Sequence, residues 1–157
     1  MVSQGFSKID GIYETHLPVA NLKRSTAFYR DVLGLELAHE FPERGIVFFW
    51  VGEKNRGMLG LWQGMAGPLK MTLHFAFRME RSEVLSSLVK LKNKKIVPLD
   101  FNGEPVEEPV VIGWMPAVSV YFKDPDGHSI EFLNILDEEP DKNFGIQPYS
   151  QWVAKHK

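Results

Sequence analysis

An internal repeat is the feature of this sequence that most constrains its fold. Residues 9–19 alternate like a strand, residues 22–33 carry apolar side chains at helical spacing, and short strands are predicted at 35–40, 46–51 and 58–62. The pattern then restarts, with strands predicted at 71–77, 96–99, 117–122 and 129–133 and a helix beginning near Ser82. Each half of the chain therefore has the predicted order β-α-β-β-β.

The repeat also sets the predicted domain organisation. We predict a single two-module domain over residues 8–135, with modules at 8–66 and 67–135 and a C-terminal tail at 136–157. The second module is about ten residues longer, and the extra residues fall in a Pro-rich, acidic loop within 102–113. A long irregular loop is often functional, but a plain surface excursion is the alternative. Apolar residues in the tail predict that it packs on the domain or on a partner chain.

Composition excludes several function classes. The 157 residues include 18 Lys and Arg against 20 Asp and Glu, spread along the chain, so nothing indicates a nucleic-acid or anionic-membrane surface. Cysteine is absent, which excludes disulfides, thiolate metal sites and a cysteine nucleophile. No apolar run is long enough for a membrane span, and no signal peptide is evident, so we expect a cytoplasmic protein.

Three ionisable side chains fall on the more polar face of predicted strands: Glu14, His74 and Glu131. Glu131, for example, lies between Ile130 and Phe132, which face the other way. A buried charge without a partner is costly, and a divalent cation would satisfy all three groups. One imidazole and two carboxylates suit Mn²⁺, Ni²⁺, Zn²⁺, Fe²⁺ or Mg²⁺. The alternative is that the two carboxylates are solvated and the imidazole is hydrogen-bonded in the core.

Two long motifs resemble the vicinal oxygen chelate superfamily. The opening of the superfamily's sequences is similar to residues 11–35, GIYETHLPVANLKRSTAFYRDVLGL. The last hairpin of the superfamily is similar to residues 120–132, VYFKDPDGHSIEF. The superfamily includes glyoxalase I, extradiol dioxygenases, fosfomycin-modifying thiol transferases, methylmalonyl-CoA epimerase and bleomycin-binding proteins. The resemblance implies an α+β fold in which two βαβββ modules form a curved mixed-sheet cup around a metal that chelates two substrate oxygens.

Carried over by position, the family's metal ligands fall on Glu14, His74 and Glu131. Glu14 departs from the usual His. Glyoxalase I has a fourth ligand, a Glu in the last strand of the first module, but the matching stretch 57–63 has no carboxylate and offers only the amide oxygen of Gln63. Three ligands with open positions resemble the dioxygenases and thiol transferases, although dioxygenases normally show His, His and Glu.

We expect a divalent-metal-dependent enzyme of the lyase, isomerase or thiol-transferase type, acting on a small oxygenated molecule. The metal would stabilise an enediolate or alkoxide, with Glu131 in the catalytic centre and His16 as a proton carrier. His16 is equally a candidate for a simple wall residue of the cup. The alternatives are a metal-free ligand-sequestering protein, like the bleomycin-binding relatives, an extradiol dioxygenase, and an interaction protein with a vestigial cup.

Aromatic residues are predicted to line an apolar substrate pocket: Trp50, Trp62, Trp114 and Tyr121. Packing in the core or in an interface is the alternative for each. The resemblance also implies a homodimer, in some members with modules exchanged between chains, and the apolar tail is a candidate brace for that dimer.

Overall fold

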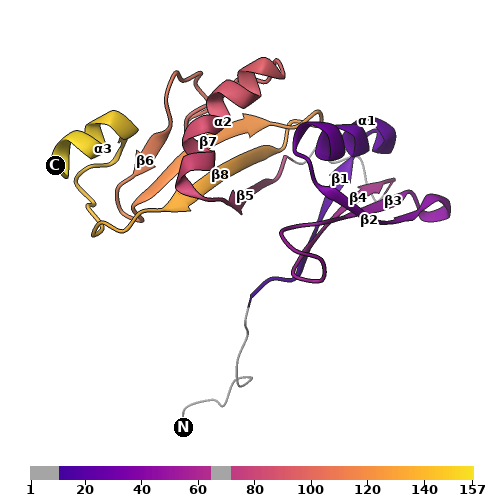
Figure 1. Cartoon of the computed structure of the whole chain (residues 1–157). Coiled ribbons are helices and arrows are strands. Elements are labelled where there is room, and N and C mark those ends of the chain that lie inside the picture. Colours follow the sequence, from indigo (N-terminus) through magenta and orange to yellow (C-terminus); the bar gives the residue numbers. More distant parts are fainter. Residues whose placement is uncertain (1–10, 65–71) are drawn as a thin grey trace, which may run out of the picture. The chain divides into compact units, whose positions relative to one another are not determined.

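The computed structural model describes residues 11–64 and 72–157, and the chain divides into two compact units, residues 1–69 and 70–157 (Figure 1). Each unit is built around one mixed sheet, one of four strands and one of five, which confirms the predicted α+β fold of two βαβββ modules. The predicted module boundary at 66/67 and the predicted strand starts at residues 9 and 71 lie outside the described residues.

The first unit has the strand order β1-β4-β3-β2, with β1 parallel to β4 and the other pairs antiparallel. Its elements are β1 (Glu14–Val19), α1 (Leu22–Ala27), the π-helical segment η1 (Phe28–Val32), β2 (Glu36–Phe41), the 3-10 turn η2 (Pro42–Arg44), β3 (Ile46–Trp50) and β4 (Met58–Gln63). Helix α1 packs on β3 and β4, and the alternate residues of the strands that face it are buried.

Local sequence signals explain where the first helix begins and ends. The side chain of Asn21 accepts a hydrogen bond from the Arg24 amide at 2.9 Å, as expected for an N-cap. Gly34 has a φ of +74°, a backbone conformation that favours glycine and ends the helix. The predicted helix 22–33 is therefore confirmed in extent, but its second half is π-helical.

The second unit has the strand order β5-β8-β7-β6-β9. Its elements are β5 (His74–Arg78), α2 (Arg81–Asn93), β6 (Val110–Ile112), β7 (Ala117–Lys123), β8 (Ser129–Ile135), β9 (Ile146–Pro148) and α3 (Tyr149–Lys155). Strand β5 is parallel to β8, and the remaining pairs are antiparallel. Helix α2 lies along the sheet and packs on β7 and β8 (Figure 1).

The prediction of a strand at 96–99 is wrong. Only Leu99 forms isolated bridges, to Pro105 and Tyr121, and Pro98 lacks the amide hydrogen that a ladder needs. The third element of the module is instead β6, inside the segment that was expected to be an irregular loop. It is three residues long and wholly buried between β7 and β9, so it shows a continuous apolar run and no alternation.

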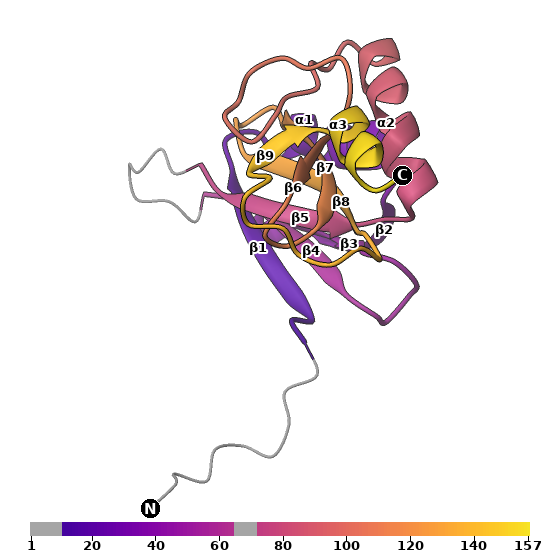
Figure 2. The same ribbon diagram turned by 90° about the vertical axis from the view of Figure 1, so that its left-hand side faces the viewer.

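The C-terminal tail packs on its own unit, which is one of the two outcomes expected for it. Strand β9 extends the sheet beyond β6, and α3 follows directly (Figure 2). Trp152 on α3 is only 1% exposed and contacts the ring of Phe144. The approach is close at Gly113, where an added Cβ would lie 2.3 Å from the carbonyl oxygen of Asp141.

The extra acidic loop of the second unit connects its two helices. Glu107 forms an ion pair with Lys92 at the end of α2. Glu108 accepts hydrogen bonds from the amide and the hydroxyl of Ser150, at 3.0 and 2.9 Å, in the first turn of α3. This part of the loop therefore braces the fold through its carboxylates.

Candidate functional site

In the second unit, His74 and Glu131 lie together on the face of the sheet that points away from α2. The strand register places Glu131 beside Ala76 of β5 and opposite Tyr121 of β7. The Nε2 atom of His74 is 3.3 Å from Oε2 of Glu131. Glu131 is only 5% exposed, whereas His74 is open to solvent. The two predicted ligands of this unit are therefore neighbours.

The remaining donor atoms of this pair suit a divalent cation. The Oε1 atom of Glu131 is buried and has no hydrogen-bond partner among the described residues. The Nδ1 atom of His74 lies 3.2 Å from the carbonyl oxygen of Ser129 and can donate its proton there. That bond fixes the orientation of the ring and leaves the Nε2 lone pair facing a carboxylate oxygen. A cation bound to both atoms would remove the repulsion between them. Metal-binding histidines commonly donate their other ring proton in this way.

A buried histidine anchors the strand that carries His74. His128 is 1% exposed, and its Nδ1 accepts a hydrogen bond from the amide of Leu73 at 3.0 Å. Its own amide donates to the carboxylate of Asp124 at 2.8 Å within the tight turn between β7 and β8. The sequence indicated that His128 and Glu131 face opposite sides of the sheet. In the structure, the His128 side chain forms a hydrogen bond with the backbone of Leu73.

Tyr121 forms the wall of the site next to this pair. Its ring lies 5.9 Å from that of His74, and the residue is buried. Burial, and secondarily the charge of Glu131, raises the pKa of the Tyr121 hydroxyl far above its ordinary value. The hydroxyl of Tyr121 therefore stays protonated.

In the first unit, Glu14 and His16 lie on the face of the sheet away from α1. The Nε2 atom of His16 contacts Oε1 of Glu14, and both side chains are about one-third exposed. Gly60 lies beside His16 in the parallel register of β1 and β4. A Cβ at Gly60 would meet Nδ1 of His16 at 2.9 Å, so the imidazole occupies the space that the missing side chain leaves.

Aromatic side chains surround His16 and form what we call the aromatic patch of unit 1, made of Phe41, Phe48 and Trp62. The imidazole packs edge-on against Phe48 at 5.5 Å and against Trp62 at 4.9 Å. The guanidinium of Arg44 lies over Phe41 at 6.0 Å and over Trp62 at 5.8 Å. This surface is suited to a flat ligand with apolar and anionic parts.

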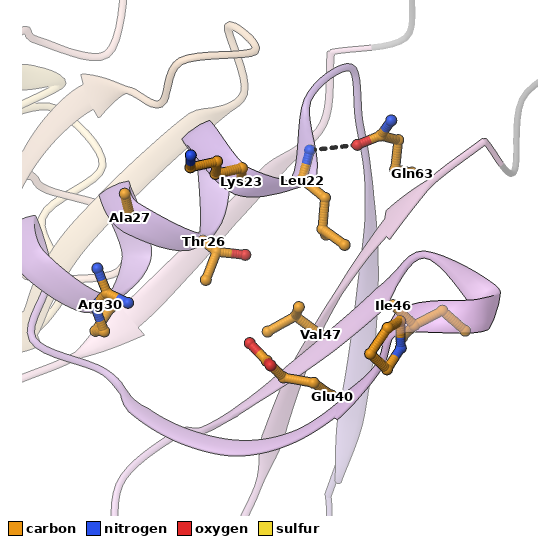
Figure 3. A pocket seen from close by; sticks show the side chains of 10 residues that line it. Leu22, Lys23, Thr26, Ala27, Arg30, Glu40, Ile46, Val47 and Gln63 are labelled. Carbon is orange, nitrogen blue, oxygen red and sulfur yellow. Dashed lines mark hydrogen bonds between the residues drawn. The ribbon is translucent and has the colours of Figure 1, made fainter.

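A separate pocket of about 560 Å³ lies on the other side of this sheet, between α1 and the β2–β3 strands (Figure 3). The residues that line it are Leu22, Lys23, Thr26, Ala27, Arg30, Glu40, Pro42, Ile46, Val47 and Gln63. Gln63, the amide considered above as a ligand, accepts a hydrogen bond from the Leu22 amide at 2.6 Å and so binds the start of α1. The side-chain oxygen of Gln63 is therefore already hydrogen-bonded, on the face of the sheet opposite Glu14.

The predicted site residues thus occur as two carboxylate–imidazole pairs, one in each unit. Over its described residues, neither unit holds by itself a group of three or more His, Asp or Glu side chains placed to bind a metal. Among the predicted pocket residues, Trp50 of β3 and Trp62 of β4 lie on the same face of the sheet as His16 of β1. Trp114 lies in the turn before β7 and is 61% exposed.

Three residues near these pairs were not predicted from the sequence: Phe48 and Arg44 of unit 1, and Phe101 beside Tyr121 of unit 2. Alternation along β3 could have identified Phe48, because Phe49 next to it is fully buried and must face α1. Arg44 and Phe101 lie in a turn and a loop, where no periodic signal exists.

Comparison with known proteins supports the resemblance of the motifs. The family model described as Glyoxalase/Bleomycin resistance protein/Dioxygenase superfamily matches residues 11–132. None of the curated proteins matches the chain.

Solved structures show the same fold. An integron cassette protein from the mobile metagenome of the Halifax Harbour sewage outfall is 33% identical, with a TM-score of 0.69, over 81% of this chain and 100% of that one. A lactoylglutathione lyase from Agrobacterium tumefaciens is 30% identical, with a TM-score of 0.61, over 80% and 94% of the two chains. The oxidase ChaP-H1 is 24% identical, with a TM-score of 0.64, over 82% and 98%, and shows the likeness of fold alone.

Proposed function

Because the chain belongs to the glyoxalase/bleomycin resistance protein/dioxygenase superfamily, we propose that it is a divalent-metal-dependent enzyme acting on a small oxygenated molecule. The observation that carries the proposal is the carboxylate of Glu131: its buried Oε1 atom has no hydrogen-bond partner among the described residues, and its Oε2 atom lies next to the imidazole of His74. An unsatisfied buried carboxylate oxygen is costly and is kept where a ligand uses it.

The residues proposed to hold the ion are Glu14, His74 and Glu131. When bound, such an ion polarises substrate oxygens as a Lewis acid and stabilises the negative charge that develops on them. Two carboxylates and one imidazole leave the choice among Mn²⁺, Ni²⁺, Zn²⁺, Fe²⁺ and Mg²⁺ open. The similarity to a lactoylglutathione lyase favours lyase or isomerase chemistry over thiol transfer.

His16 is the proposed proton carrier. Its Nε2 contacts the carboxylate of Glu14, which orients the ring, and the side chain is partly exposed on the face of the sheet where substrate would bind. A histidine oriented by a carboxylate can take a proton from a substrate carbon and return it to a neighbouring atom.

Metal content of the untagged protein tests the proposal. We expect stoichiometric metal in the wild type, and its loss in Glu14→Ala, His74→Ala and Glu131→Ala. His39→Ala is the matched control, since that imidazole packs on Phe41 and is not one of the proposed ligands. A wild-type protein that neither contains metal nor takes it up from micromolar Mn²⁺, Ni²⁺ or Zn²⁺ would overturn the proposal.

A metal-free ligand-binding protein is the second candidate, and the aromatic patch of unit 1 favours it. A flat drug-like molecule could stack there beside the Arg44 guanidinium without any metal. His74→Ala separates the two functions, because it should abolish a metal-dependent activity but leave ligand affinity at the patch nearly unchanged. Oxygen uptake with catechols tests the dioxygenase alternative.

We also propose that the chain forms a homodimer. Strands β1 and β5 each lie at an edge of their own sheet, and open strand edges invite pairing. A monomeric mass by light scattering would remove this proposal.

No helix among the described residues is both long and apolar enough to cross a membrane.

A further inference from the structure

Phe101 is an exposed aromatic side chain that contacts Tyr121, the neighbour of the candidate metal ligands of the second unit. It is 58% exposed, and its ring lies edge-to-face against Tyr121, with centroids 6.1 Å apart and planes at 84°. The Tyr121 ring is in turn 5.9 Å from that of His74, and Tyr121 lies opposite Glu131. Phe101 is therefore the outermost member of a row of side chains that leads to the ligand pair.

The backbone around Phe101 is held in place by hydrogen bonds on both sides. Leu99 exchanges both of its backbone hydrogen bonds with β7, at 2.7 and 3.0 Å. The carboxylate of Asp100 accepts from the amides of Asn102 and Glu104, at 2.8 and 2.9 Å. An exposed aromatic ring forfeits hydrophobic free energy, and this bracing fixes the ring in the exposed position.

Resting on the metal-dependent function proposed above, we propose that Phe101 is a specificity-determining residue that contacts the apolar part of the substrate. The substrate class that fits is a neutral compound whose two neighbouring oxygens are attached to an aromatic ring or another flat apolar group. Such a group can pack against Phe101 and Tyr121 while its oxygens reach the ion that His74 and Glu131 would hold.

The charge of the loop supports a neutral substrate tail. Asp100 comes directly before Phe101, and Glu104 follows it by three residues in the same loop. Carboxylates near the ring repel an anionic tail, whereas an uncharged aromatic group pays no such cost. The loop therefore selects against substrates that carry a carboxylate at this end.

Binding of hydroxamates to the Zn²⁺-loaded full-length protein tests the inference. Acetohydroxamate, benzohydroxamate and naphthohydroxamate share one chelating group and differ in the size of the apolar group, and their affinities can be measured by calorimetry. We expect the wild type to prefer the aromatic probes. Phe101→Ala should reduce that preference about 2- to 10-fold, with acetohydroxamate binding unchanged and Phe101→Leu in between.

Val89→Ala on α2 is the matched control, an exposed apolar residue on a helix that faces away from the site. A wild type that binds none of the three probes, with or without Zn²⁺, refutes the proposed metal-dependent function itself. A wild type that binds all of them, while Phe101→Ala leaves the preference for aromatic probes intact, refutes the role of Phe101 alone.

Discussion

Replacing Glu131 by Met should stabilise the metal-free protein and abolish metal binding. The carboxylate is 5% exposed, one of its oxygens has no hydrogen-bond partner among the described residues, and its ion-pair partner His74 is half exposed. Met has a similar length and carries no charge.

The magnitude follows from the cost of burying an incompletely satisfied charge. Replacement of buried ionic groups by apolar side chains of similar volume is neutral to about 4 kcal/mol stabilising. An unsatisfied buried acceptor alone costs about 1–3 kcal/mol. Because a solvent-exposed His74 contributes little to the ion pair, we expect the metal-free Glu131→Met protein to gain about 1–2 kcal/mol in the free energy of unfolding.

Saturating metal should reverse this order. A ligand at about 100 times its dissociation constant adds about 2.7 kcal/mol to the wild type and nothing to a variant that cannot bind it. Urea unfolding followed by circular dichroism, in chelator and in excess Ni²⁺, measures both effects. Glu83→Met on the exposed face of α2 is the control and should change stability by no more than about 0.5 kcal/mol.

The reasoning is refuted if the metal-free Glu131→Met protein is less stable than the wild type by more than about 1 kcal/mol. That result would mean that the carboxylate is satisfied within the fold and serves as a structural hydrogen-bond acceptor.

Three further changes test the surroundings of the site. Gly113→Ala should destabilise by about 1–3 kcal/mol or more, seen as a lower urea midpoint, because the new methyl group would overlap the carbonyl oxygen of Asp141. His128→Leu should cost about 1–3 kcal/mol more than His128→Asn, since only Asn offers an acceptor to the Leu73 amide, whose hydrogen exchange should quicken in the Leu variant alone. The hydrogen bond from Lys155 lowers the pKa of Asp141, so the stability that this contact contributes is present above the ordinary aspartate pKa and is lost as pH falls through the lower folded value. Asp141→Asn should flatten that acid limb of the stability profile.

Local patterns in the sequence predicted the parts of the fold that local forces determine. The N-cap at Asn21 and the stop at Gly34 depend on residues within one helical turn. Alternation along a strand likewise placed Glu14 with His16 on one face, because side-chain direction in a strand depends only on the position along it.

The remaining elements depend on contacts between distant segments. Strand β6 is defined by partners on both sides, β7 and β9, and β9 lies more than thirty residues further along the chain. A three-residue run buried on both faces carries no periodic signal of its own. The same limit applies to Phe101, whose position follows from the pairing of Leu99 with Tyr121 and from no feature of its neighbours in sequence.

The carboxylate of Glu14 and the missing side chain at Gly60 are connected through the imidazole of His16. The absence of a side chain at Gly60 is what allows the His16 imidazole to lie against β4, and that imidazole contacts Glu14, the carboxylate that stands where the family usually has His. A larger residue at position 60 would displace the ring and leave Glu14 without its partner. The carboxylate on β1 and the glycine on β4 therefore belong together, and each unit still presents one carboxylate and one imidazole on the face away from its helix. A donor set of this composition suits a divalent ion as well as the usual one, so the substitution at Glu14 is compatible with the metal-dependent function proposed for the chain.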